Sequence, residues 1–94
     1  MKGRRLADVF GRRPLPLPLD DLQPGDYWRH RHVPEYPGVW FAIPPEEGFS
    51  VANLTNHEVI EHDDATITVS PSIRVRHLDG EWHGWLERGE WRSV

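Results

Sequence analysis

The stretch WHGWLERGEWR, Trp82 to Arg92, carries an alternating pattern that indicates the fold class of this chain. Apolar and polar residues alternate on both sides of Arg88-Gly89, and glycine readily adopts the left-handed backbone that a two-residue hairpin turn requires. The pattern therefore predicts an antiparallel hairpin. The turn also fixes the register, which pairs Glu87 with Glu90, Leu86 with Trp91 and Trp85 with Arg92.

This register assigns the side chains of the hairpin to two faces, because successive side chains on a strand point in opposite directions. One set is apolar and is expected to enter the core: Trp82, Leu86 and Trp91. The other face carries His83, Trp85 and Arg92, and the guanidinium of Arg92 can lie over the Trp85 ring. We take this second face as a candidate binding surface, and Trp28, from an earlier strand, as a further candidate.

The stretch TITVSPSI, Thr66 to Ile73, indicates a strand broken at Pro71. Because proline cannot donate a ladder hydrogen bond, we expect the strand to stop there and the chain to turn a corner between two sheet segments. Ile73 then resumes the inward pattern. An alternative places Ser70 or Ser72 in a nucleophilic triad with His62 and an aspartate, but no G-x-S-x-G elbow supports it.

The rest of the chain from Asp26 onward also alternates between short apolar runs and turns. Strands are predicted at 27–33, 39–43, 57–62, 66–70 and 72–77. Prolines and glycines recur throughout, which argues against long helices. The fold class is therefore mainly β, a small single domain built as an antiparallel sheet or as a partly open barrel or sandwich.

The sequence divides into a basic tail at 1–13, a Pro-rich strap at 14–26 and a β domain at 27–94. The tail carries a net charge of +4 and the remainder carries −8. An acidic body disfavours nucleic-acid binding, since phosphate repels it. The tail can still contact nucleic acid, an acidic partner or the body.

The tail and the strap have different local preferences. RRLADVF, Arg4 to Phe10, predicts a short helix with its apolar residues on one side, and a helix of this length must dock to persist. The alternating Pro and Leu of the strap favour an extended polyproline conformation. Its leucines are expected to lie along the body; the alternative is a ligand for a proline-binding groove on another protein.

Composition limits the kinds of site that the chain can build. It has no cysteine, which excludes disulfides and thiolate metal sites, and no apolar run long enough for a membrane helix. The start lacks the apolar core of a signal peptide, so we expect a cytoplasmic protein without membrane contact. No Gly-rich phosphate loop, H-E-x-x-H or EF-hand pattern occurs, and no cofactor is predicted.

Histidines supply the alternative to a pure binding protein, since imidazole is a common metal ligand. His30 and His32 share one face of a strand, whereas His57 and His62 fall on opposite faces unless a bulge intervenes. The candidate ligands are His30, His32, His57, His62 and His83. EHDD, Glu61 to Asp64, gathers acids that suit either an acid–base pair, a hard-cation site or an ordinary solvated turn.

Two motifs carry a resemblance to known proteins. They are the segment from His57 to Ile73 and the segment from Trp82 to Trp91. They resemble small actinobacteriophage proteins and a broader bacterial family with a T-x-S-P-S-I segment, a His-aromatic strand and a G-x-x-W ending. The resemblance covers residues 56–94, and it implies a phage origin without implying an activity.

The chain departs from that family pattern in two ways. Family members often carry cysteines that suggest a zinc site with the histidine matching His83, and here there are none. The hairpin tip of the family is usually Asp-Gly, and here it is Asp64-Ala65. Alanine resists a positive φ, so either Asp64 adopts that conformation or the loop is longer.

The sequence thus favours a non-enzymatic phage accessory protein that binds a host or phage protein in the bacterial cytoplasm. The alternative is a His-based or degenerate metal-binding domain, and a weaker one is nucleic-acid binding through the basic tail and tryptophans. Open strand edges and many tryptophans also favour a homo-oligomer.

Overall fold

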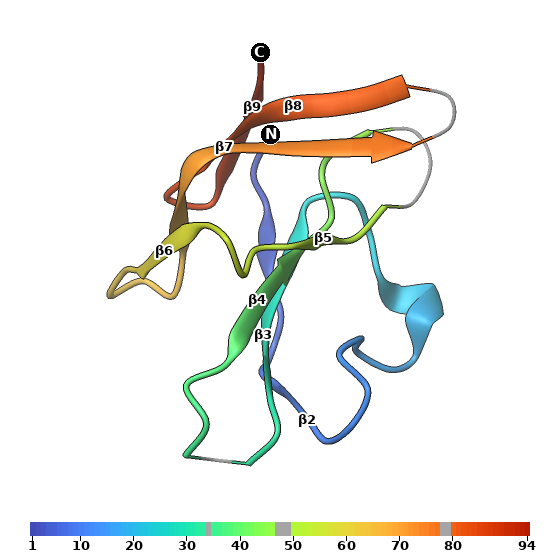
Figure 1. The fold of residues 1–94 in the computed structure, drawn as a ribbon, viewed down its shortest axis with the longest axis vertical. Helices are drawn as coiled ribbons and strands as arrows, with labels where there is room; N and C mark the ends of the chain where they lie inside the picture. Colours follow the sequence, from blue (N-terminus) through green and yellow to red (C-terminus); the bar gives the residue numbers. More distant parts are fainter. Residues whose placement is uncertain (34, 47–49, 78–79) are drawn as a thin grey trace.

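The computed structural model describes residues 1–33, 35–46, 50–77 and 80–94, which form two sheets (Figure 1). The first sheet contains β1 (Arg4–Arg5), β2 (Val9–Phe10), β3 (Asp26–Arg31), β4 (Val39–Ala42) and β5 (Ala52–Asn53). The second contains β6 (Glu58–Glu61), β7 (Ile67–His77), β8 (Gly80–Glu87) and β9 (Glu90–Ser93). A 3-10 turn, η1 (Leu19–Asp21), lies between β2 and β3. The prediction of a mainly β chain is confirmed.

The C-terminal hairpin of β8 and β9 has the predicted register, with Leu86 opposite Trp91 and Trp85 opposite Arg92. Arg88 and Gly89 both have positive φ, 46° and 76°, as a two-residue turn with the twist of a hairpin requires. The predicted core set of this hairpin is buried: Trp82, Leu86 and Trp91.

Among the described residues, no helix is long and apolar enough to cross a membrane.

Strand β7 corrects the expectation that the strand stops at Pro71. It continues from Ile67 to His77 and accommodates the proline as a shift in register against β8. Val69 lies opposite Leu86 and Ile73 opposite Gly84, so four steps on β7 face two steps on β8. Two residues are therefore extra, and because two is even, the side chains beyond the bulge keep facing the core. Figure 1 shows β7 turning between its two parts, which fulfils the expected corner without ending the strand.

The predicted helix at Arg4–Phe10 is wrong. The segment is extended instead, and β1 and β2 both pair in parallel with β3, so the first sheet is mixed. The buried carboxylate of Asp26 in β3 favours this arrangement, since it accepts from Arg4 Nε at 2.9 Å and Nη2 at 2.7 Å. Seven residues gain little from an isolated helix, whereas pairing with β3 satisfies their backbone groups.

Residues Met1–Gly3, which precede β1, lie against the second sheet. The amide of Gly3 donates to the carbonyl of Gly89, and the amide of Trp91 donates to the carbonyl of Met1, both at 2.7 Å. The Trp91 indole donates in turn to the Gly25 carbonyl at 3.0 Å, just before β3. One extended segment therefore pairs with an edge of each sheet.

The first sheet has an apolar cluster on each face. Tyr27 of β3 points into the core between the two sheets, together with buried residues of β7, β8 and β9. Its neighbour Trp28 points the other way and packs with Leu22 and Ile43. Tail and strap residues, including Leu6 and Leu15, cover this second cluster. The expectation that strap leucines lie along the body holds for Leu15 and Leu22, while Leu17 and Leu19 are exposed.

The Gly3→Ala variant tests the junction of the two sheets. A Cβ at this position would lie 2.7 Å from the Gly25 carbonyl oxygen and 2.8 Å from the Trp91 indole nitrogen, so the N-terminal segment must move. We expect a loss of about 2 kcal/mol in the free energy of unfolding, measured in urea. Lys2→Ala, a matched change at an exposed position, should stay within about 0.5 kcal/mol of wild type. Equal stability of Gly3→Ala and wild type would contradict the role of this junction.

Candidate functional site

The outer face of β8 and β9 brings His83, Trp85 and Arg92 together, as the register predicts. Trp85 is 36 % exposed, whereas Trp28, Trp82 and Trp91 are buried. The guanidinium carbon of Arg92 lies 5.5 Å from the centroid of the Trp85 ring, and the rings of His83 and Trp85 are 6.3 Å apart. Arg92 is also held by an ion pair with Glu87. The result is an aromatic surface beside the Arg92–Glu87 ion pair.

Strand β7 adds Ser72 and Arg74 to this surface. Ser72 Oγ and His83 Nε2 are hydrogen-bonded at 2.8 Å, and Arg74 lies opposite His83 in the ladder. We call the set Ser72, Arg74, His83, Trp85 and Arg92 the Trp85 face. No local pattern predicts that Ser72 and Arg74 belong to it, because the size of the register shift at Pro71 decides which residues of β7 reach His83.

Trp28 does not belong to any surface, which corrects its prediction as a binding residue. It is 0 % exposed, and its indole nitrogen donates to the Pro14 carbonyl at 2.7 Å. Its ring stacks on Phe41 of β4 with centroids 6.0 Å apart. The sequence could not reveal this burial, because the strap that covers Trp28 comes from a different part of the chain.

The candidate metal ligands are dispersed. His30 and His32 do lie together, with ring centroids 5.1 Å apart, but His30 Nε2 is hydrogen-bonded to the Gly11 carbonyl oxygen at 2.7 Å. His57 bonds to the Ser72 carbonyl oxygen and His62 to Thr68 Oγ1. Within the described part of the chain, no three His, Asp or Glu side chains come together as a metal-ligand set.

Side-chain contacts also bear on the two catalytic alternatives, the serine triad with His62 and the acid–base pair of the EHDD motif. His62 is bonded to Thr68 Oγ1 at 2.7 Å, and Ser72 is bonded to His83 instead, so the proposed triad of a serine with His62 is not formed. Glu61 pairs with Arg5 at 2.8 Å and with Arg29 at 3.6 Å. The glutamate of the EHDD motif therefore links β6 to the first sheet.

The tip of the β6–β7 hairpin is a three-residue loop. Of the two expectations for Asp64-Ala65, a positive φ at Asp64 or a longer loop, the longer loop is therefore correct. The amide of Ala65 donates to the His62 carbonyl at 3.0 Å, and the amide of His62 donates to the Thr66 carbonyl at 2.8 Å. Ala65 itself adopts the positive φ, 70°. The loop is thus longer than a two-residue turn, and Asp64 does not take the left-handed position.

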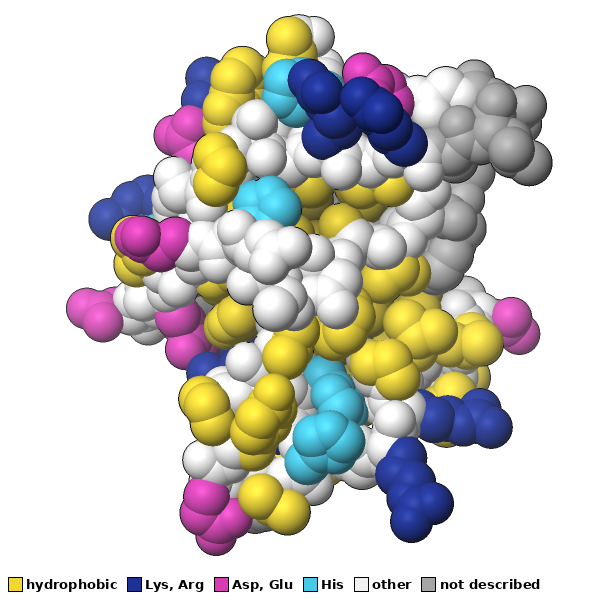
Figure 2. Space-filling model, in the orientation of Figure 1, with side chains coloured by type: hydrophobic (Ala, Val, Ile, Leu, Met, Phe, Trp, Pro, Cys, Tyr) yellow, Lys and Arg dark blue, Asp and Glu magenta, His cyan; other side chains and the backbone are white. Residues whose placement is uncertain are grey.

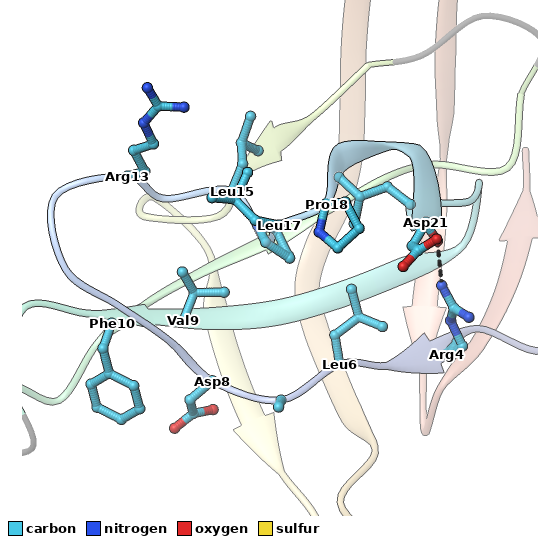
Figure 3. Close-up of a pocket in the computed structure, with 13 residues that line it drawn as sticks. Arg4, Leu6, Asp8, Val9, Phe10, Arg13, Leu15, Leu17, Pro18 and Asp21 are labelled. Atoms are coloured by element: carbon cyan, nitrogen blue, oxygen red, sulfur yellow. Dashed lines mark hydrogen bonds between the residues drawn. The ribbon is translucent and has the colours of Figure 1, made fainter.

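A groove opens between the extended N-terminal segment, residues 1–13, and the strap, residues 14–26 (Figure 3). Its volume is about 570 Å³. Leu6 and Val9 of the N-terminal segment lie across it from Leu15, Leu17 and Pro18 of the strap. The sequence predicted neither wall as part of a pocket, because the groove requires the tail to be extended rather than helical.

Comparisons with protein-family models, with curated proteins and with solved structures gave no match. The interpretation of both surfaces rests on their geometry.

The Ala65→Gly variant tests the backbone of the hairpin tip. Glycine adopts positive φ without the steric cost that alanine incurs, so we expect a gain of about 1 kcal/mol in the free energy of unfolding. Urea unfolding measures it. The same change at exposed Ala7, whose φ is negative, should lower the stability instead, because glycine has more conformational freedom to lose on folding. A loss of stability in Ala65→Gly would contradict the assigned loop.

Asp64 gives a pH-dependent prediction. Its carboxylate accepts from the Thr66 hydroxyl at 2.6 Å and from the Thr66 amide at 3.1 Å, and these bonds hold the pKa of Asp64 below its ordinary 3.8. A lowered pKa means that the carboxylate stabilises the fold above the unfolded pKa and that this contribution disappears as the pH falls through the folded one.

We therefore expect Asp64→Ala to be less stable than wild type at about pH 7, with a smaller difference at about pH 3. Urea unfolding at both values measures the difference. Asp63→Ala, at the exposed neighbouring carboxylate, is the control for removal of an acidic side chain from this turn. A difference between Asp64→Ala and wild type that is independent of pH would assign the effect to the turn rather than to the charge.

Proposed function

We propose that this chain is a non-enzymatic phage accessory protein that binds a host or phage protein in the bacterial cytoplasm through the Trp85 face. The observation that carries the proposal is the exposure of Trp85. The other four tryptophans are buried or partly buried, and Trp40, the partly buried one, lies under the guanidinium groups of Arg5 and Arg29. A tryptophan left outside the core of so small a chain suits contact with a partner.

The chemistry of the Trp85 face supports a protein as the partner. Tryptophan and arginine dominate the energetic centres of protein interfaces, and here Arg92 lies directly over Trp85. The surface is also preorganised, because Leu86 and Trp91 anchor β8 and β9 in the core while Ser72 fixes the His83 ring. Little side-chain freedom would be lost on binding.

Nucleic-acid binding through the tail has less support. Arg4 is paired with Asp26, and Arg5 is paired with Glu61 and Asp8. These two arginines serve the fold, which leaves the exposed Arg12 and Arg13 for a phosphate backbone, next to an acidic body that repels it. We therefore place the contact on the Trp85 face and expect a protein there.

Capture from bacterial host lysate with immobilised protein tests the proposal. We expect wild type to retain a specific protein. Trp85→Ala should retain at least about tenfold less of that protein, since a central interface tryptophan contributes strongly to affinity. Val33→Ala, at an exposed residue beyond the end of β3, is the matched control and should capture as wild type does. Urea unfolding of each variant confirms that the fold is retained. Equal capture by Trp85→Ala and wild type would refute the proposal.

The full chain must be used in this experiment. Removing the tail and strap would also remove β1 and β2, which pair with β3, and the Met1–Gly3 segment, which bonds to Gly89 and Trp91, and it would uncover Trp28. A truncated chain would therefore report on folding and not on binding.

A further inference from the structure

We propose that the groove between the N-terminal segment and the strap is a second docking site, which binds an extended segment of a protein partner with alternating apolar side chains and an acidic end. The groove lies on the opposite face of the first sheet from the second sheet, so this inference is independent of the Trp85 face.

The walls of the groove are fixed to the body and to each other. Trp28 donates to the Pro14 carbonyl beneath it, at 2.7 Å. Arg4 joins the two walls, because its guanidinium bonds to Asp26 of β3 and also to the Asp21 carbonyl oxygen of η1 at 2.8 Å. The groove is therefore preformed, which reduces the entropic cost of binding a flexible segment.

The groove and its rim leave large apolar side chains in contact with solvent. Leu17 is 67 % exposed, Phe10 53 % and Leu19 48 %. Figure 3 shows Phe10 projecting to the far side of the N-terminal segment, so the apolar surface continues beyond the groove itself. In Figure 2, hydrophobic side chains gather over the strap and η1 in the same way. A surface that extends past a pocket suits an elongated segment better than a small molecule.

Charge gives the occupant a direction. Arg13 lines one end of the groove, and its neighbour Arg12 is exposed. Neither of these two arginines has a partner among the residues that the structure describes. Asp8 in the lining is already balanced by Arg5 and Arg29, at 3.4 Å and 3.2 Å. Carboxylates of a bound segment would therefore lie at the Arg13 end.

The opposite end of the groove does not attract carboxylates. It carries Asp21 beside Arg4, whose guanidinium is already bonded to Asp26. The groove is thus apolar in the middle and cationic at one end. An acidic group followed by spaced leucine-like side chains complements both features.

The test is titration of the full-length, isotope-labelled protein with two synthetic peptides, followed by amide chemical shifts. The peptides are EELSLSL and KKLSLSL, each acetylated and amidated. We expect the acidic peptide to shift the amides of residues 4–22 and to bind about tenfold more tightly than the basic one. Equal affinity of the two peptides, or shifts confined to other residues, would overturn the proposal.

Three variants make the result specific to the groove. Arg13→Glu and Leu17→Ser, both at exposed positions that the fold tolerates, should each weaken EELSLSL binding by about tenfold. Val33→Ser is the matched apolar control and should bind as wild type does. Trp85→Ala should also bind the peptide unchanged, which separates this site from the Trp85 face. Loss of binding in either control would overturn the assignment.

Two further measurements decide the class of occupant. If sedimentation shows a dimer that Leu17→Ser abolishes, the occupant is a second copy of this chain. If sodium decanoate produces the same shifts and binds more tightly than EELSLSL, the occupant is a small acidic amphiphile. Either result would overturn the proposal of a partner segment, whereas a monomer that prefers the peptide supports it.

Discussion

The structure depends on one extended segment, Met1–Arg5, that pairs with both sheets. Its first residues bond to β9, and its last two pair with β3. The Trp91 indole reinforces the junction by donating to the Gly25 carbonyl. Edge strands with free backbone groups invite unwanted pairing, and here the N-terminal segment occupies an edge in each sheet. The relative position of the sheets, and so the core between them, follows from this one segment.

The same extended path creates the groove. Because the chain runs along β3 before it turns back through the strap, Leu6 and Val9 face Leu15 across open space. The strap in turn seals Trp28 and completes the second apolar cluster. A helix at this position would have removed the parallel strands and the groove together. The tail and the strap are therefore parts of the body and not appendages to it.

The bulge at Pro71 has a comparable effect on the second sheet. Without the two extra residues, Ser72 would stand opposite His83; with them, Arg74 takes that place. Ser72 still reaches His83 through its hydroxyl. The proline thus shapes the Trp85 face while the even number of inserted residues preserves the inward direction of Ile73.

Local pattern determined much of this protein. The alternation around Arg88-Gly89 was enough to give the register of β8 and β9, the burial of Trp82 and Leu86, and the contact of Arg92 with Trp85, because a tight turn and a period of two leave one solution. Tertiary structure decided the rest. The strap buries Trp28, pairing with β3 makes the tail a strand, and the shift at Pro71 selects the neighbours of His83. Each of these depends on contacts between distant segments, whose energies no local preference contains.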